Sequence, residues 1–143
     1  IKLPILIPEN YIKDLSLRLS IYRRLGGLNS KIDFSTFENE MINRFGPIPI
    51  EFKNLIELVL LKSDAAKAKI IRIDADFKNI LIYFNHNFND YTKEFINWVT
   101  NNSEITLLDT YKIKITNSHD NNSNLLLQVY QIVNRIKNIL VNN

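Results

Sequence analysis

The spacing of hydrophobic residues predicts a helical first half of the chain. Apolar side chains recur every three or four positions over Tyr11–Leu25, Phe34–Phe45 and Ile50–Lys69. This is the spacing of helices that bury one face. Gly26–Gly27 and Gly46 are the expected ends of the first two helices, because glycine readily takes the backbone conformation that stops a helix.

The same spacing predicts which face of each helix is buried. Asp33 or Ser35 is the expected N-terminal cap of the second helix, and Ser35 with Glu38 has the spacing of a capping box. The expected apolar faces are Leu15, Leu19 and Tyr22 in the first helix, Phe34, Phe37, Met41 and Phe45 in the second, and Phe52, Leu55, Ile56, Val59 and Leu60 in the third.

Beyond residue 69 the pattern changes to one that includes strands. Ile113 and Ile115 alternate with Lys112 and Lys114, which is typical of a strand with one buried face. The polar residues 74–76 are expected to form a turn between two strands. The expected strands are residues 71–73, 80–84, 105–108 and 111–116, and the expected helices are residues 90–101 and 125–141.

This order of elements indicates an α+β fold. We expect an N-terminal three-helix segment packed beside a small, mostly antiparallel four-stranded sheet covered by two helices. Residues 1–143 are interpreted as a single domain, with a helical half of about 1–69 and a strand-containing half of about 70–143. Because the chain does not begin with Met, we expect it to be part of a longer protein.

Composition excludes several classes of function. The chain has no cysteine, which excludes a disulfide scaffold, thiolate metal sites and a cysteine nucleophile. Its 18 basic and 15 acidic residues nearly balance, so net charge does not identify a partner. The opening residues 1–7 are too short for a membrane span or a signal peptide. Its three glycines form neither a Walker nor a dinucleotide pattern, so we expect no nucleotide hydrolysis by this segment. We also expect no bound cofactor, no metal and no catalytic residues in this chain.

A few polar residues remain as candidates for chemistry. His86 and His119 lie in Asn-rich segments, and His119 with Asp120 is the basis for a hydrolase hypothesis. Two histidines without a paired ligand motif are weak evidence for a metal site. Asp74 and Asp76 are interpreted as turn residues, although they could hold a cation.

The basic side chains of the first helix offer a second candidate function. Arg18, Arg23 and Arg24 could contact phosphates in a nucleic-acid-binding accessory domain. Nothing near them resembles a motif that reads a nucleic-acid groove, so a solvated or partner-facing surface is the preferred interpretation.

The second helix carries the sharpest candidate surface. With about 100° between successive residues, Thr36, Glu40 and Asn43 project away from the phenylalanine face and are expected to be exposed. They are therefore available to a partner. Solvation alone is an equally good interpretation, with Glu40 pairing to Arg44 one turn later and Arg44 favouring the helix C-terminus.

Three segments of the helical half resemble a known family. Pro8–Ile12 (PENYI), Tyr22–Leu25 (YRRL) and Glu40–Pro49 (EMINRFGPIP), together with Arg18–Leu19, are similar to the C-terminal domain of bacterial transcription-repair coupling factors, the Mfd family. The resemblance covers about residues 6–66, and beyond it only the order and length of the elements are similar.

The resemblance implies a regulatory domain. In this family the parent is an ATP-driven translocase on double-stranded DNA that displaces stalled RNA polymerase and recruits excision repair through UvrA. ATP and magnesium would bind in its upstream motor domains and not in this chain. The C-terminal domain folds back on a UvrB-like N-terminal module of the same polypeptide, masks its UvrA-binding surface and restrains the motor. We also expect a cytoplasmic location, no membrane partner and no direct contact of this domain with DNA.

The implied partner-binding residues are Glu40, Asn43 and Arg44. Glu40 matches an interface acid of the family, whereas position 43 is usually Asp and is Asn here. One charge that would face a basic partner is therefore missing, although the amide still accepts a hydrogen bond.

Overall fold

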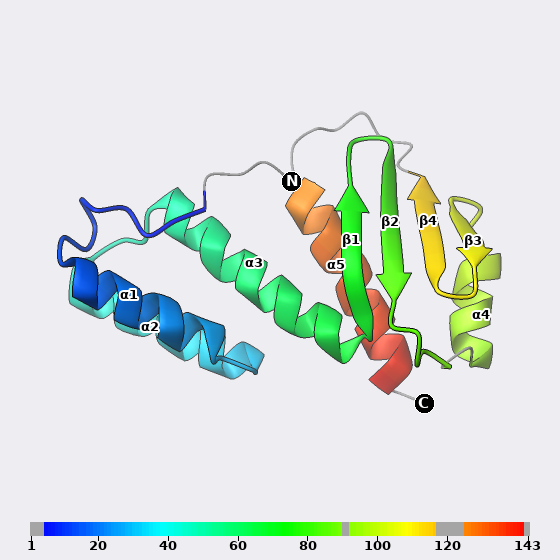
Figure 1. The fold of residues 1–143 in the computed structure, drawn as a ribbon, viewed down its shortest axis with the longest axis horizontal. Helices are drawn as coiled ribbons and strands as arrows, with labels where there is room; N and C mark the ends of the chain where they lie inside the picture. Colours follow the sequence, from blue (N-terminus) through cyan, green and yellow to red (C-terminus); the bar gives the residue numbers. More distant parts are fainter. Residues whose placement is uncertain (1–4, 90–91, 117–124, 142–143) are drawn as a thin grey trace. The chain divides into compact units, whose positions relative to one another are not determined.

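A computed structural model describes residues 5–89, 92–116 and 125–141, which contain five helices and four strands (Figure 1). The chain divides into two compact units, residues 2–63 and residues 64–143. The boundary between them falls within one helix, α3 (Ile50–Lys67).

Helix α1 (Leu15–Gly26) is shorter than its hydrophobic pattern predicts. Asp14 caps it by accepting hydrogen bonds from the backbone N–H groups of Ser16 and Leu17, and this fixes the helix start at Leu15. The preceding residues form a turn in which Tyr11 and Ile12 both donate to the carbonyl of Pro8.

The predicted buried face of α1 is wrong. Leu15, Leu19 and Tyr22 are 60%, 47% and 37% exposed, whereas Ile21 and Leu25 are 1% exposed. The helix carries two apolar stripes at helical spacing, and spacing alone does not tell which one packs.

Helix α2 (Lys31–Phe45) buries the predicted face. Phe34, Phe37 and Met41 are buried, at no more than 3% exposed, and Phe45 packs against the same core. The predicted cap is wrong, since Ser30 accepts the N–H of Asp33 and starts the helix three residues earlier than expected. Gly46 ends it as predicted, at a φ of 92° that other residues rarely adopt.

The core of residues 2–63 joins this face of α2 to α1, α3 and the N-terminal segment. Tyr11 packs edge-on against Phe52, and Phe52 in turn packs edge-on against Phe37. The buried members are Ile7, Ile12, Ile21, Leu25, Phe34, Phe37, Met41, Phe52 and Ile56.

Residues 64–143 contain an antiparallel sheet in the order β1-β2-β4-β3. Its strands are β1 (Ile70–Ala75), β2 (Asn79–Phe84), β3 (Ile105–Asp109) and β4 (Lys112–Thr116). Strand β1 extends to Ala75, so the turn after it is tighter than predicted. Asp76 closes that turn by accepting the N–H groups of Lys78 and Asn79.

Two helices accompany the sheet. Helix α4 (Lys93–Thr100) is capped by Thr92 and buries Phe95, and its predicted first residues 90 and 91 lie outside the described part of the chain. Helix α5 (Leu125–Val141) has the predicted bounds and lies behind β1 in Figure 1. Val129, Val133 and Ile136 of α5 are at most 1% exposed, which makes it the central core helix of this unit.

The α+β prediction is therefore confirmed: the chain has a three-helix segment followed by a four-stranded antiparallel sheet with two further helices. Among the described helices, none combines the length and apolar character needed to cross a membrane.

Candidate partner-binding site

The candidate site lies on the side of α2 opposite its buried phenylalanines. Thr36 and Asn43 are exposed, as the helical spacing predicts, whereas Glu40, also expected to be exposed, is half-buried. The orientation follows from the packing of α2, because burying Phe37 and Met41 in the core directs the opposite face outward.

Glu40 is held by two arginines from two helices. Arg24 of α1 donates from Nη1 to Oε2 at 2.7 Å and from Nη2 to Oε1 at 2.8 Å, a two-point ion pair. Arg44, one turn along α2, donates from Nη1 to Oε2 at 3.0 Å. We call Arg24, Glu40 and Arg44 the Glu40 cluster.

The cluster remains accessible to solvent. The side chains of Arg24, Glu40 and Arg44 are 43%, 35% and 44% exposed. Both guanidinium groups also lie over aromatic rings, Arg24 at 5.5 Å from the centroid of Phe37 and Arg44 at 4.9 Å from that of Phe45. The rings give the charged groups a fixed support, which lowers the entropy lost when a partner binds them.

The arginines stabilise the ionised form of Glu40. The hydrogen bonds from Arg24, followed by those from Arg44, lower the pKa of Glu40 from 4.5 to about 2. The reciprocal hydrogen bond raises the pKa of Arg24. Glu40 is therefore a carboxylate and Arg24 a cation at every pH near neutrality.

The Glu40 cluster keeps hydrogen-bonding groups that a partner protein can use. A carboxylate accepts about four hydrogen bonds, and three positions of Glu40 are taken by the arginines. The cluster has two positive charges and one negative charge, and further guanidinium N–H groups remain for a partner. Asn43 adds an exposed amide that both donates and accepts.

Sequence reasoning found the pair of Glu40 with Arg44 but missed the pair with Arg24. Arg24 and Glu40 are 16 positions apart in the sequence, so no local spacing indicates their contact. Their position in the sequence instead suggests that the arginines of α1 are candidate phosphate contacts. Arg18 is engaged differently, since it donates to the carbonyls of Ile12 and Lys13 at 2.7 and 3.0 Å.

The other candidate residues are accounted for as follows. His86 stacks on Tyr111 with 4.9 Å between ring centroids, and His119 and Asp120 lie outside the described residues. Asp74 pairs with Arg72 at 3.0 Å. Backbone hydrogen bonds from Asn79 and Lys78 lower the pKa of Asp76, as expected of a turn residue. In the described part of the chain, no three His, Cys, Asp or Glu side chains gather as a metal site.

Comparison with known proteins places the chain in a family. A family model described as the TRCF domain matches residues 1–95. The chain belongs to the TRCF domain family. The TRCF-domain match includes both α1 and α2, and so all three residues of the Glu40 cluster.

The similar proteins are transcription-repair-coupling factors. That of Rickettsia conorii is 41% identical over 98 residues, covering 68% of this chain and 9% of that protein. That of Escherichia coli is 29% identical over 84 residues, covering 59% of this chain and 7% of that protein. The chain thus spans about a tenth of the length of such relatives.

A solved structure extends the similarity of fold to nearly the whole chain. The crystal structure of the C-terminal domain of transcription-repair coupling factor superposes with a TM-score of 0.79, at 17% identity, covering 98% of this chain and 90% of that one. The chain therefore has the fold of that C-terminal domain.

Proposed function

We propose that this TRCF chain is a non-catalytic autoinhibitory domain. It docks on a UvrB-like N-terminal module of the same polypeptide, masks the surface that binds UvrA and restrains an ATP-driven translocase on DNA. Glu40, Asn43 and Arg44 form the docking surface, with Arg24 added as the residue that holds Glu40 in place.

The observation that carries the proposal is the exposed, supported Glu40 cluster. The positions that the family resemblance implies as interface residues lie on one accessible helix face. Glu40 and Arg44 are oriented by ion pairs before any partner arrives, and the arginines that hold Glu40 lie over the rings of Phe37 and Phe45. A partner therefore meets charged groups that need little reordering.

The cluster supports a contact that is specific but weak. Its charges are largely satisfied within the chain, so a partner gains only the remaining acceptor positions of Glu40, the free N–H groups and the Asn43 amide. Polar contacts of this kind at an exposed rim contribute little affinity individually. An isolated domain with this surface would bind its partner module loosely.

Tethering makes a weak contact sufficient. When both surfaces belong to one polypeptide, the effective concentration is on the order of mM for a short flexible linker. The domain then stays docked most of the time, even though the same contact would be weak between separate molecules. A ligand that binds the open state better, such as UvrA or the polymerase complex, shifts the population toward release.

Charge reversal at Glu40 in the intact parent tests the proposal. E40K places a cation between Arg24 and Arg44, so it should undo the cluster, loosen docking and raise the amount of UvrA that the parent retains. The matched control is E57K, at an exposed position of α3. Circular dichroism of the isolated chain establishes that both variants fold. If the folded E40K parent retains no more UvrA than the wild type or E57K, the masking role is wrong.

A further inference from the structure

The sheet of residues 64–143 has a second face that does not contribute to its core. Side chains alternate along the strands, and Ile80, Ile82, Ile113 and Ile115 point into the core. The intervening positions point to the opposite face, and the register aligns them in rows. The rows are Arg72, Tyr83, Lys112 and Asp109, and next to them Asp74, Leu81, Lys114 and Thr106.

The first row places an aromatic ring between two cations. The guanidinium carbon of Arg72 lies 5.2 Å from the centroid of the Tyr83 ring, and Nζ of Lys112 lies 4.8 Å from it. Arg72 and Lys112 come from the strands on either side of Tyr83. The ring therefore orients two positive charges across three adjacent strands.

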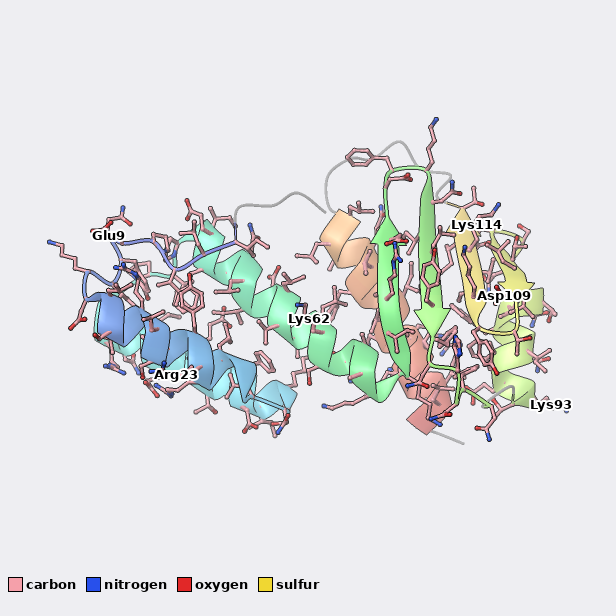
Figure 2. All side chains as sticks on the ribbon, viewed as in Figure 1. Glu9, Arg23, Lys62, Lys93, Asp109 and Lys114 are labelled. Carbon is pink, nitrogen blue, oxygen red and sulfur yellow. The ribbon has the colours of Figure 1, made fainter. Side chains whose placement is uncertain are left out.

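Lys112 and Lys114 leave this face with an excess of positive charge, because the cations of the two rows outnumber their carboxylates, Asp74 and Asp109. Asp74 neutralises Arg72 through an ion pair of 3.0 Å. Asp109 is the register partner of Lys112, but its Oδ1 accepts the backbone N–H of Tyr111 at 2.7 Å. Within the described residues neither lysine forms an ion pair. Lys114 and Asp109 are labelled on the sheet in Figure 2.

A cavity adjoins the first row. It has a volume of about 320 Å³, and Tyr83, His86, Tyr111 and Lys112 are among its lining residues. The rings of His86 and Tyr111 are nearly parallel, at 16°, with 4.9 Å between centroids. The cavity thus combines flat π-surfaces with hydroxyl, imidazole and ammonium groups and with the carboxylate of Asp109, and Lys112 of β4 forms part of its wall.

We infer that this sheet face binds single-stranded nucleic acid. Lys112 and Lys114 lie two residues apart on one strand, about 7 Å along it, and contact the phosphate backbone. A base enters the cavity beside them and stacks against the aromatic pair of His86 and Tyr111. Recognition of single strands combines such cations with aromatic surfaces, because every base offers a π-face.

The chemistry favours a nucleic acid over an acidic polypeptide. Both ligands satisfy the lysines, but a nucleic acid supplies a planar ring on every unit that carries a phosphate, next to the charge that the lysines bind. This surface differs from the α1 arginines considered from sequence, and it revises the expectation that the domain makes no direct contact with DNA. The proposal is independent of docking through the Glu40 cluster.

Fluorescence anisotropy with a labelled oligo-dT 12-mer tests the inference on the 143-residue chain. Two phosphates neutralised on a single strand predict an affinity that falls about seven-fold between 50 and 200 mM NaCl, since the slope is roughly −0.7 per phosphate. The K112Q/K114Q variant should bind more weakly and lose most of this salt dependence. The K62Q/K93Q variant, with the same change in charge at lysines outside the face, should bind as the wild type does (Figure 2).

Two further variants test whether negative charge on the face weakens binding and whether a base stacks in the cavity. D109N keeps an acceptor for the Tyr111 N–H but removes a negative charge from the face, so it should tighten binding. Y111L removes one ring of the cavity, so it should weaken binding while the salt dependence stays that of the wild type. The single tryptophan, Trp98, reports whether residues 64–143 remain folded in each variant.

Several outcomes would overturn the inference. These are the absence of oligo-dT binding at 50 mM NaCl, labelled poly-glutamate binding as tightly as oligo-dT, equal losses in K112Q/K114Q and K62Q/K93Q, or weaker binding by D109N. Loss of binding confined to an R18Q/R23Q variant would move the site to α1 and would also contradict it.

Discussion

Arg24 and Glu40, which are 16 residues apart in the chain, form a two-point ion pair that joins α1 to α2. Arg44 completes it from the next turn of α2. The ion pair has two consequences. It fixes the position of α1 relative to α2, and it orients the charged groups that we propose bind a partner. The first consequence can be measured on the isolated chain.

The ion pair predicts a pH dependence of stability. The pKa of Glu40 is lowered from 4.5 to about 2, so its contribution is complete above pH 4.5 and is lost as the pH falls toward 2. Because the carboxylate is about one-third exposed, solvent screens the ion pair. We therefore expect the pair to contribute about 1 kcal/mol at most to the free energy of unfolding. Urea unfolding followed by circular dichroism should show E40Q less stable than wild type by that amount at pH 7 and equal to it near pH 2. A difference that persists at pH 2 would mean that packing, and not charge, is responsible.

Two glycines should respond to alanine in opposite directions. Gly46 has a φ of 92°, where a Cβ is strained although no atom lies within 4 Å of it, so G46A should lower the free energy of unfolding by about 1–3 kcal/mol. Gly26, the last residue of α1, has open space around its Cβ position and no positive φ. G26A should therefore stabilise the chain by about 0.4–1 kcal/mol by restricting the unfolded state. Thermal unfolding of both variants is the measurement, and similar shifts in both would refute the backbone explanation.

Asp64 and Lys137 should show an asymmetric response to mutation. Asp64 of α3 is 4% exposed, and its Oδ1 accepts from Nζ of Lys137 of α5 at 3.2 Å. The side chain of Lys137 is 24% exposed and can reach water, whereas Asp64 cannot. K137M leaves a buried carboxylate without its partner, so it should lower the free energy of unfolding by about 3–5 kcal/mol. We expect D64N to lower it by less. The D64L/K137M double variant should recover most of the loss. Urea unfolding monitored by Trp98 fluorescence reports on residues 64–143. A larger loss of stability in D64N than in K137M would contradict the prediction that the unpaired carboxylate of Asp64 is the costly group.

Restoring an acid at position 43 should strengthen the proposed docking. Asn43 is exposed, so N43D adds a negative charge at the surface without disturbing the core. If the partner module is basic there, a pull-down of this chain by that module should increase about two- to five-fold at low salt, as expected for one exposed ion pair. The gain should disappear at high salt, where exposed charges are screened. N97D, on the exposed part of α4, is the control, and an equal gain in N97D would indicate only a general effect of charge.

Local sequence was sufficient wherever one face of an element is clearly apolar. The buried residues Phe34, Phe37 and Met41 of α2 follow from spacing, and the bounds of α5 are those predicted. The alternation of Ile113 and Ile115 with lysines identified β4 and its buried face. Gly46 was recognised as a helix end because its role depends on its own backbone.

The local sequence led to a wrong prediction where two alternative buried faces, or several alternative helix caps, fit the same local pattern. Both apolar stripes of α1 fit a helix, and only packing selects Ile21 and Leu25 over Leu15 and Leu19. Ser30, and not Asp33 or Ser35, caps α2. All three residues are good caps, so the position at which the chain leaves the preceding turn decides among them.

By itself, the amino-acid sequence determined the type and order of the elements, most of the buried faces and the outward orientation of Glu40 and Asn43. Those properties depend on side-chain periodicity within one element. The tertiary structure alone decided that Arg24 holds Glu40, that Tyr83 lies between Arg72 and Lys112, and that Asp64 is buried against Lys137. These contacts join residues from different elements, and their distances are set by how those elements pack.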